Sequence, residues 1–133
     1  MHNKKIRNFM SSPVISINKE ANINDAGSLM DKNKVGSLLV KEGENYVGII
    51  TKTDLIQKVI SKNLDHETTQ THAIMTATIL TLDHETTIKE AVELMGENKT
   101  RHLGVTENNK IVGVLSIKDI SEQFANQYLR VFY

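Results

Sequence analysis

The chain has 133 residues, which is enough for one domain of ordinary size. Sixteen basic residues balance sixteen acidic ones, and this zero formal charge argues against a strongly basic nucleic-acid binder and against a polybasic attachment to membranes. The absence of cysteine excludes disulfide scaffolds, thiolate metal sites and cysteine nucleophiles.

The sequence has no segment typical of membrane proteins or secreted proteins. No stretch approaches the roughly 20 apolar residues of a membrane-spanning helix. The basic N-terminus is not followed by the apolar run and cleavage site of a secretory signal. With 39% apolar and 24% charged residues, the composition is that of a globular protein. We therefore expect a cytoplasmic protein with an ordinary hydrophobic core.

The two halves of the sequence repeat one pattern at an offset of 65 residues. Residues 9–56 align without a gap with residues 74–121. The identical pairs include Met10/Met75, Ile23/Ile88, Ala26/Ala91, Gly48/Gly113 and Asp54/Asp119. Because apolar positions, glycines and carboxylates recur together, we interpret the fold as two copies of one pattern.

Each half predicts a strand, a helix, a hairpin and a second helix, in that order. In the first half the strand is 14–17, the helix starts at 23, the apolar runs 37–40 and 46–50 flank a turn, and the second helix contains 55–60. The second half repeats this order with 79–82, 88–95, 102–105, 111–115 and a helix that contains residues 120 to 128. The pairs Asn22/Asp25 and Thr87/Glu90 have the spacing of helix caps.

These elements predict an α+β fold made of two β-α-β-β-α repeats. We place the first repeat at 1–62, a linker at 63–71 and the second repeat at 72–133, with an aromatic tail at its C-terminus. A three-stranded unit of this size is marginally stable alone, so the repeats should pack together with pseudo-twofold symmetry. The aromatic tail contains Phe124, Tyr128, Phe132 and Tyr133. It either folds back over the core of its own domain or packs on a second subunit or an effector protein.

The segments from Gly48 to Asp54 and from Gly113 to Asp119 contain the residues most suited to ligand binding. Each connects a predicted strand to the N-terminus of a helix, where free N–H groups favour an anion. A hydroxyl, from Thr51 or Ser116, precedes an aspartate by three residues, and that carboxylate can accept two hydrogen bonds from a vicinal diol such as ribose. The same spacing fits a helix capping box, in which the backbone uses both groups.

With these two Gly-x-x-[Thr/Ser]-x-x-Asp segments and the Ala26/Met30 and Ala91/Met95 helix positions, the chain resembles a tandem pair of cystathionine β-synthase (CBS) domains, a Bateman module. The resemblance covers about residues 5 to 128. It implies a regulatory module without catalysis that binds AMP, ADP, ATP, S-adenosylmethionine or a dinucleotide in clefts between the repeats. It also implies a flat homodimer that forms through the helical faces.

The resemblance implies two clefts. In each, an aspartate binds the ribose, the hydroxyl residue lies beside it, and apolar residues hold the base. The first cleft would contain Asp54, Thr51, Ile49, Met75, Thr78, Ile79, Leu80 and Thr100. The second would contain Asp119, Ser116, Val114, Met10, Pro13, Val14, Ile15, Val35, Gly36, Arg101 and His102. Arg101 and His102 would face phosphate, whereas the first repeat has Gly36 and Ser37 at those positions, so we expect unequal occupancy of the clefts.

No other pattern indicates a catalytic or metal site. The five histidines do not pair at metal-ligand spacing, and no nucleophile elbow, phosphate-binding loop or dinucleotide fingerprint is present. We therefore expect neither an enzyme nor a metal site. The leading hypothesis is an adenine-nucleotide sensor that acts in trans on a separate effector protein, and the alternative is a ligand-free module for dimerisation or partner docking.

Overall fold

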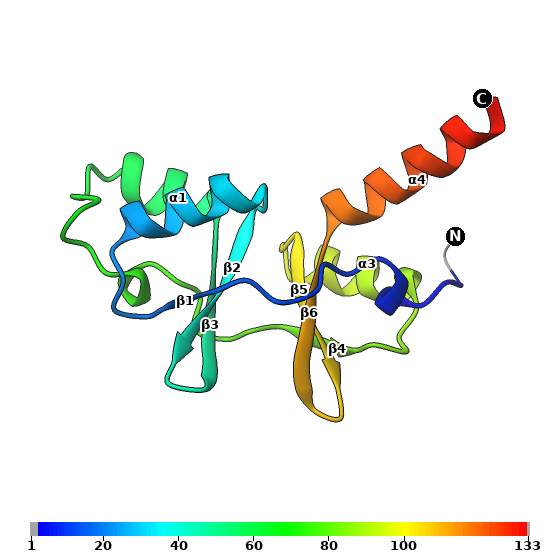
Figure 1. Ribbon diagram of the computed structural model, residues 1–133, viewed down its shortest axis with the longest axis horizontal. Helices are drawn as coiled ribbons and strands as arrows, with labels where there is room; N and C mark the ends of the chain where they lie inside the picture. Colours follow the sequence, from blue (N-terminus) through cyan, green and yellow to red (C-terminus); the bar gives the residue numbers. More distant parts are fainter. Residues whose placement is uncertain (1–2, 133) are drawn as a thin grey trace. The chain divides into compact units, whose positions relative to one another are not determined.

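Each copy of the repeated pattern builds a three-stranded sheet with the same topology (Figure 1). In this computed structural model, residues 3–132 are described, and their side chains as far as Ala125. The chain divides into two units: Ile15–Ile79 form one, and the segment up to Val14 together with the chain from Leu80 onward forms the other. We call them the Asp54 unit and the Asp119 unit.

Both sheets combine one parallel and one antiparallel pairing. In the Asp54 unit, β1 (Ser16–Asn18) lies parallel to β2 (Ser37–Glu42), which pairs antiparallel with β3 (Asn45–Thr51). In the Asp119 unit, β4 (Thr81–Asp83), β5 (His102–Glu107) and β6 (Lys110–Ser116) repeat this order. The predicted α+β class and the predicted order of elements are confirmed.

The first strand of each repeat begins two residues later than the sequence pattern predicts. Val14, Ile15, Ile79 and Leu80 precede β1 and β4. The carbonyl of Ile15 accepts a hydrogen bond from the backbone of Leu39, and the carbonyl of Leu80 accepts one from Gly104. Parallel pairing therefore starts at these carbonyls, and the apolar residues before them are not strand.

The first helix of each repeat starts at the predicted cap. Asn22 accepts a hydrogen bond from the backbone of Asp25 at the start of α1 (Ile23–Asn33), and Thr87 does the same for Glu90 at the start of α3 (Ile88–Glu97). These bonds satisfy N–H groups that have no partner within the helix. Both predicted caps are confirmed.

The second helices of the two repeats differ in geometry. After β3, a single α turn, α2 (Lys52–Asp54), continues as a π-helix, η2 (Leu55–Ile60), whereas α4 (Ile117–Phe132) is a continuous α-helix. The backbone N–H of Ser61 bonds to the carbonyl of Ile56, five residues earlier, which is the π pattern. Equivalent positions along the two helices therefore have different surroundings.

The segment that precedes each first strand belongs to the unit of the other repeat. It contains the 3-10 turn η1 (Ile6–Asn8) in one case and η3 (Thr71–Ala73) in the other. Ser11 exchanges two backbone hydrogen bonds with Val114 of β6, and Thr76 exchanges two with Ile49 of β3. Figure 1 shows the N-terminal segment, in dark blue, beside α3. Each sheet thus gains a short antiparallel neighbour from the other half of the sequence.

Each unit has its own hydrophobic core. In the Asp54 unit the buried side chains come from β1, α1, the hairpin, η2 and the incoming segment: Ile17, Ile23, Ala26, Met30, Leu38, Val40, Ile50, Val59 and Ile74. In the Asp119 unit they are Ile6, Phe9, Ile88, Ala91, Met95, Leu103, Val105 and Leu115. The incoming segments are therefore parts of the two cores.

The second helix of the Asp119 unit carries an exposed aromatic side chain. Phe124 is 57% exposed, whereas Val59, at the equivalent position of the first repeat, is buried. The side chains of Tyr128 and Phe132, and all of Tyr133, lie outside the described residues, so both interpretations of the aromatic tail stay predictions. Within residues 3–132, no helix combines the length and the apolar character needed to cross a bilayer.

We predict that Gly48→Ala destabilises the fold by about 1–3 kcal/mol through overpacking. A Cβ at this position would lie 2.5 Å from Met75 Sδ and 2.8 Å from the backbone oxygen of Thr76, where the incoming segment crosses β3. Urea denaturation measures the loss. Gly96→Ala is the matched control, because nothing lies within 4 Å of its added Cβ on α3, and it should stabilise the helix by up to about 1 kcal/mol. Equal effects of the two changes would contradict this close approach.

Candidate functional site

The motif of the first repeat forms a complete capping box at the start of α2. The backbone N–H of Thr51 donates to Asp54 Oδ2 at 2.9 Å, and the backbone N–H of Asp54 donates to Thr51 Oγ1 at 3.2 Å. Thr51 Oγ1 also donates to Asp54 Oδ2 at 3.1 Å. The second carboxylate oxygen, Asp54 Oδ1, lies 3.0 Å from Lys58 Nζ. Both oxygens of this largely buried carboxylate are therefore engaged.

Among the described residues, the motif of the second repeat bonds through only one carboxylate oxygen. Asp119 Oδ2 accepts from the backbone N–H of Ser116 at 3.2 Å and from the Ser11 hydroxyl at 3.3 Å. The backbone N–H of Asp119 donates to Ser116 Oγ at 3.0 Å. Within the part of the chain that the structure describes, Asp119 Oδ1 has no hydrogen bond or ion pair. This oxygen can accept from a ligand without displacing a protein group.

Several residues predicted for the second cleft lie together in the Asp119 unit. Val114 pairs with Ser11, and Met10 lies against Gly113, where an added Cβ would be 2.6 Å from its Sδ. The carbonyl of Arg101 accepts from the backbone N–H of Ile117 at 3.1 Å, and His102 is opposite Ser116 in the hairpin. Pro13 and Val14 end the incoming segment of this unit. The Ser116 hydroxyl and the Asp119 carboxylate thus lie at the start of α4, and the backbone of Arg101 is bonded to the first residue of this helix.

The Asp54 unit repeats this arrangement without the arginine. Ile49 pairs with Thr76, and Met75 lies against Gly48. The carbonyl of Gly36, in the position of Arg101, accepts from the backbone N–H of Lys52 at 3.0 Å. Thr78 and Ile79 end the incoming segment. The only charged side chain bonded to the motif among the described residues is Lys58.

The remaining predicted contacts connect residues of different units. Ile15, Val35 and Gly36 belong to the Asp54 unit but were predicted for the cleft of Asp119. Leu80 and Thr100 belong to the Asp119 unit but were predicted for the cleft of Asp54. These five assignments stay predictions.

Ser11 and Lys58 contact the two motif carboxylates but were not among the predicted site residues. Ser11 is 108 residues from Asp119, and no spacing in the sequence connects them. Lys58 carried a detectable signal, because it follows Asp54 at the i,i+4 spacing that brings side chains together on a helix, whereas Gln123 follows Asp119. Comparison of the two repeats beyond the motif would have found this difference.

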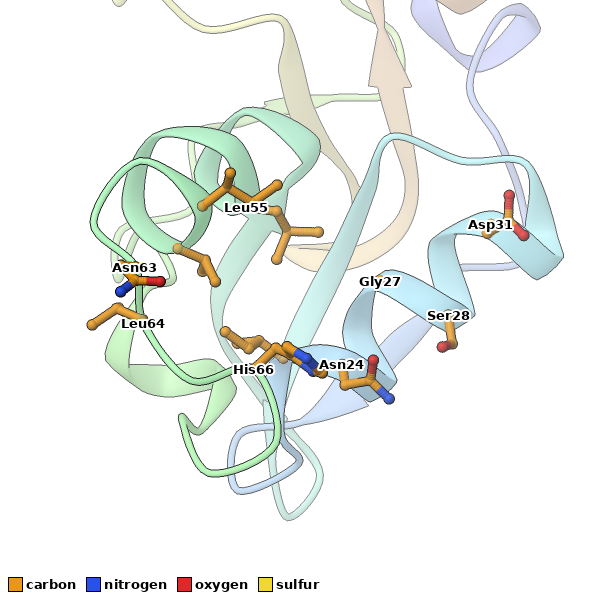
Figure 2. Close-up of a pocket in the computed structure, with 11 residues that line it drawn as sticks. Asn24, Gly27, Ser28, Asp31, Leu55, Asn63, Leu64 and His66 are labelled. Atoms are coloured by element: carbon orange, nitrogen blue, oxygen red, sulfur yellow. The ribbon is translucent and has the colours of Figure 1, made fainter.

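A separate pocket of about 600 Å³ lies on the helical face of the Asp54 unit. Residues of α1, η2 and the following loop line it, among them Gly27, Leu55, Asn63, Leu64 and His66 (Figure 2). Thr51 and Asp54 are not part of its lining. Among the described residues, no group of three or more histidine, aspartate or glutamate side chains could hold a metal ion.

The sequence profile of the CBS domain matches the chain twice, at residues 6–61 and 72–126. The chain belongs to the CBS domain family. CBS pairs are regulatory and signal-transduction modules that generally bind adenosyl ligands, and proteins made only of CBS domains are generally non-catalytic.

Similar CBS proteins are known from bacteria and archaea. The CBS domain-containing protein YhcV of Bacillus subtilis is 23% identical over 92% of this chain and 87% of its own length. An uncharacterized conserved protein from Pyrococcus horikoshii superposes with a TM-score of 0.86 at 29% identity, over 92% of this chain and 93% of that one. A protein from Burkholderia ambifaria, described as acting in signal transduction with CBS domains, superposes with a TM-score of 0.85 at 27% identity, over 91% and 93%.

We predict that Asp54→Ala and Asp119→Ala both lower the free energy of unfolding of the ligand-free protein, because each removes the carboxylate half of a capping box, a hydrogen bond worth about 1 kcal/mol. Asp54→Ala should have the larger effect, since it also leaves Lys58 without its carboxylate partner. Urea denaturation measures both values. An unchanged stability in either variant would show that its carboxylate does not cap the helix in solution.

Proposed function

We propose that the chain is an adenosyl-nucleotide sensor that binds AMP, ADP or ATP at the Asp119 motif and acts in trans on a separate effector protein. One observation supports this site. Ser116 and Ser11 orient the Asp119 carboxylate through Oδ2, and its other oxygen, Oδ1, has no partner among the described residues. A carboxylate accepts about four hydrogen bonds, so two hydroxyls of a ribose can be added to the two that exist. The capping box is kept when the ligand binds.

Arg101 and the helix terminus support the phosphate side of the proposal. Arg101 is exposed, and its carbonyl accepts a hydrogen bond from the first residue of α4, so its backbone lies at the helix end at which anions are favoured. α4 spans 16 residues, long enough for an appreciable dipole. Because the chain has no net charge, phosphate attraction depends on such placed groups.

Regulation follows from differential binding. A ligand shifts a conformational equilibrium only by the difference between its affinities for the two states. Asp119 and Ser116 cap the start of α4, and Ser11 belongs to the N-terminal segment. A ligand on the Asp119 carboxylate therefore lies next to both of these elements. Changes in the geometry of these elements are the signal that we propose an effector protein detects.

The capping boxes also support the alternative function, a ligand-free module for dimerisation or docking. In that case Thr51, Asp54, Ser116 and Asp119 serve only the helix ends. A nucleotide-binding experiment therefore distinguishes the two functions.

We predict that millimolar AMP, ADP or ATP raises the melting temperature, since ligand at about 100 times its dissociation constant stabilises by roughly 2.7 kcal/mol. S-adenosylmethionine and a dinucleotide complete the panel. Asp119→Asn should weaken binding at least tenfold, and 2′-deoxy-AMP should bind more weakly than AMP because the diol is incomplete. Asp25→Asn, in the first turn of α1, is the charge-matched control and should bind like the wild type.

The absence of any thermal shift across this panel would contradict the sensor function and favour the alternative. An effect of Asp25→Asn equal to that of Asp119→Asn would show that overall charge, rather than the motif, determines binding.

We further propose that the protein forms a homodimer through its helical faces. Ile60, which lines the 600 Å³ pocket, is 73% exposed on η2, and Val92 and Phe124 are exposed on α3 and α4. Burial of exposed apolar groups of this kind at an interface lowers the free energy of the protein.

We predict that Ile60→Glu shifts the mass measured by light scattering from dimer to monomer without loss of secondary structure. Gln57→Glu adds the same charge on the same helix at an exposed polar position and should leave the dimer intact. A dimer that withstands Ile60→Glu, or a wild type that is monomeric at high concentration, would contradict this interface.

A further inference from the structure

The two repeats place different side chains one helical turn after the motif aspartate. Lys58 follows Asp54 by four residues, and Gln123 occupies the equivalent position after Asp119. Lys58 Nζ lies 3.0 Å from Asp54 Oδ1 and donates to the carbonyl of Ile74 at 3.0 Å. The ammonium group is therefore held at two points, one on the motif and one on the incoming segment.

This contact uses the part of the carboxylate that a diol needs. Asp54 Oδ2 already accepts from the backbone and the hydroxyl of Thr51, and Oδ1 takes the ammonium. Three of about four acceptor positions are then occupied, against two on Asp119, whose Oδ1 has no partner among the described residues. A ribose at Asp54 would have to displace a cation from a carboxylate whose side chain is only 11% exposed.

The surroundings of the lysine strengthen this internal contact. Lys58 is on the π-helix η2, and its side chain is 40% exposed, so it is partly shielded from water. The Coulomb attraction between opposite charges at hydrogen-bond distance is larger where solvent screening is reduced. Gln123 is exposed on α4 and has no charge to offer Asp119.

We infer that Lys58 is an internal occupant of the first motif and takes the place of a ligand on Asp54. Nucleotides therefore do not bind at that repeat, and the Asp119 motif is the single nucleotide site of the chain. Lys58 and Gln123 are then the residues that set which repeat binds. This inference rests on the proposed nucleotide-binding function and adds its stoichiometry and its selectivity between repeats.

Exchange of the two residues tests the inference, with AMP as the probe and equilibrium dialysis as the measure of sites per chain. The wild type should bind one AMP, and Lys58→Gln should bind two. Gln123→Lys should bind at least tenfold more weakly at the second motif, a loss of about 1.4 kcal/mol. The double exchange should bind one AMP, and Asp54→Asn added to it should abolish that binding.

Lys62→Gln is the matched control, because it removes the same charge from an exposed position that has no ion pair among the described residues. It should leave one site per chain. Cooperative urea unfolding of every variant confirms that the counts refer to folded protein.

The outcomes distinguish this inference from the function on which it rests. A wild type that binds two AMP, or a Lys58→Gln variant that still binds one, overturns the internal occupant while nucleotide binding stands. Weaker binding by Lys58→Gln also overturns it, because the lysine would then contact phosphate. Failure of every chain, wild type included, to bind AMP overturns the proposed AMP binding and this inference with it.

Discussion

The close contact between each incoming segment and the last strand of a hairpin is the constraint on which both units depend. Ser11 bonds to Val114 and Thr76 bonds to Ile49 through paired backbone hydrogen bonds, and a methionine lies over a glycine beside each pair. Only a residue without Cβ permits this approach. The contact adds Ile6 and Phe9 to one core and Ile74 to the other, so each repeat is completed by residues from the opposite half of the sequence.

The capping role of the motif is compatible with the binding role that we propose for it. A carboxylate that caps a helix is already oriented and partly desolvated, so a ligand that uses its other oxygen does not have to order it. The two repeats share this arrangement and differ in what is added to it. On Asp119, Ser11 bonds to the oxygen that Ser116 already uses, and the other oxygen has no partner among the described residues. On Asp54, Thr51 bonds to one oxygen and Lys58 to the other. The two motif carboxylates therefore differ because of single side chains added to a repeated framework.

Much of the fold could be predicted because its signals are local. The 65-residue repeat, the helix caps at Asn22 and Thr87 and the turns of both hairpins depend on neighbouring residues, and the structure confirms the predicted order of elements. The starts of β1 and β4 were wrong because the apolar run does not show where pairing with β2 and β5 begins. The hydrogen bond from Ser11 to Asp119 depends on tertiary structure, which no spacing in the sequence indicates. The Asp54–Lys58 pair could have been predicted, because the two repeats differ at this i,i+4 position.

The crossing of the incoming segments affects the order in which the chain can fold during synthesis. Residues 15–79 are contiguous, so the Asp54 unit has all its parts soon after they leave the ribosome. Ile6 and Phe9 are made before the Asp54 unit, yet their partners, from Ile88 to Leu115, are made after it. Domains generally fold as they are completed. The segment that precedes the Asp54 unit is therefore buried after that unit, and its two apolar side chains stay exposed to chaperones and other chains until the second repeat is made.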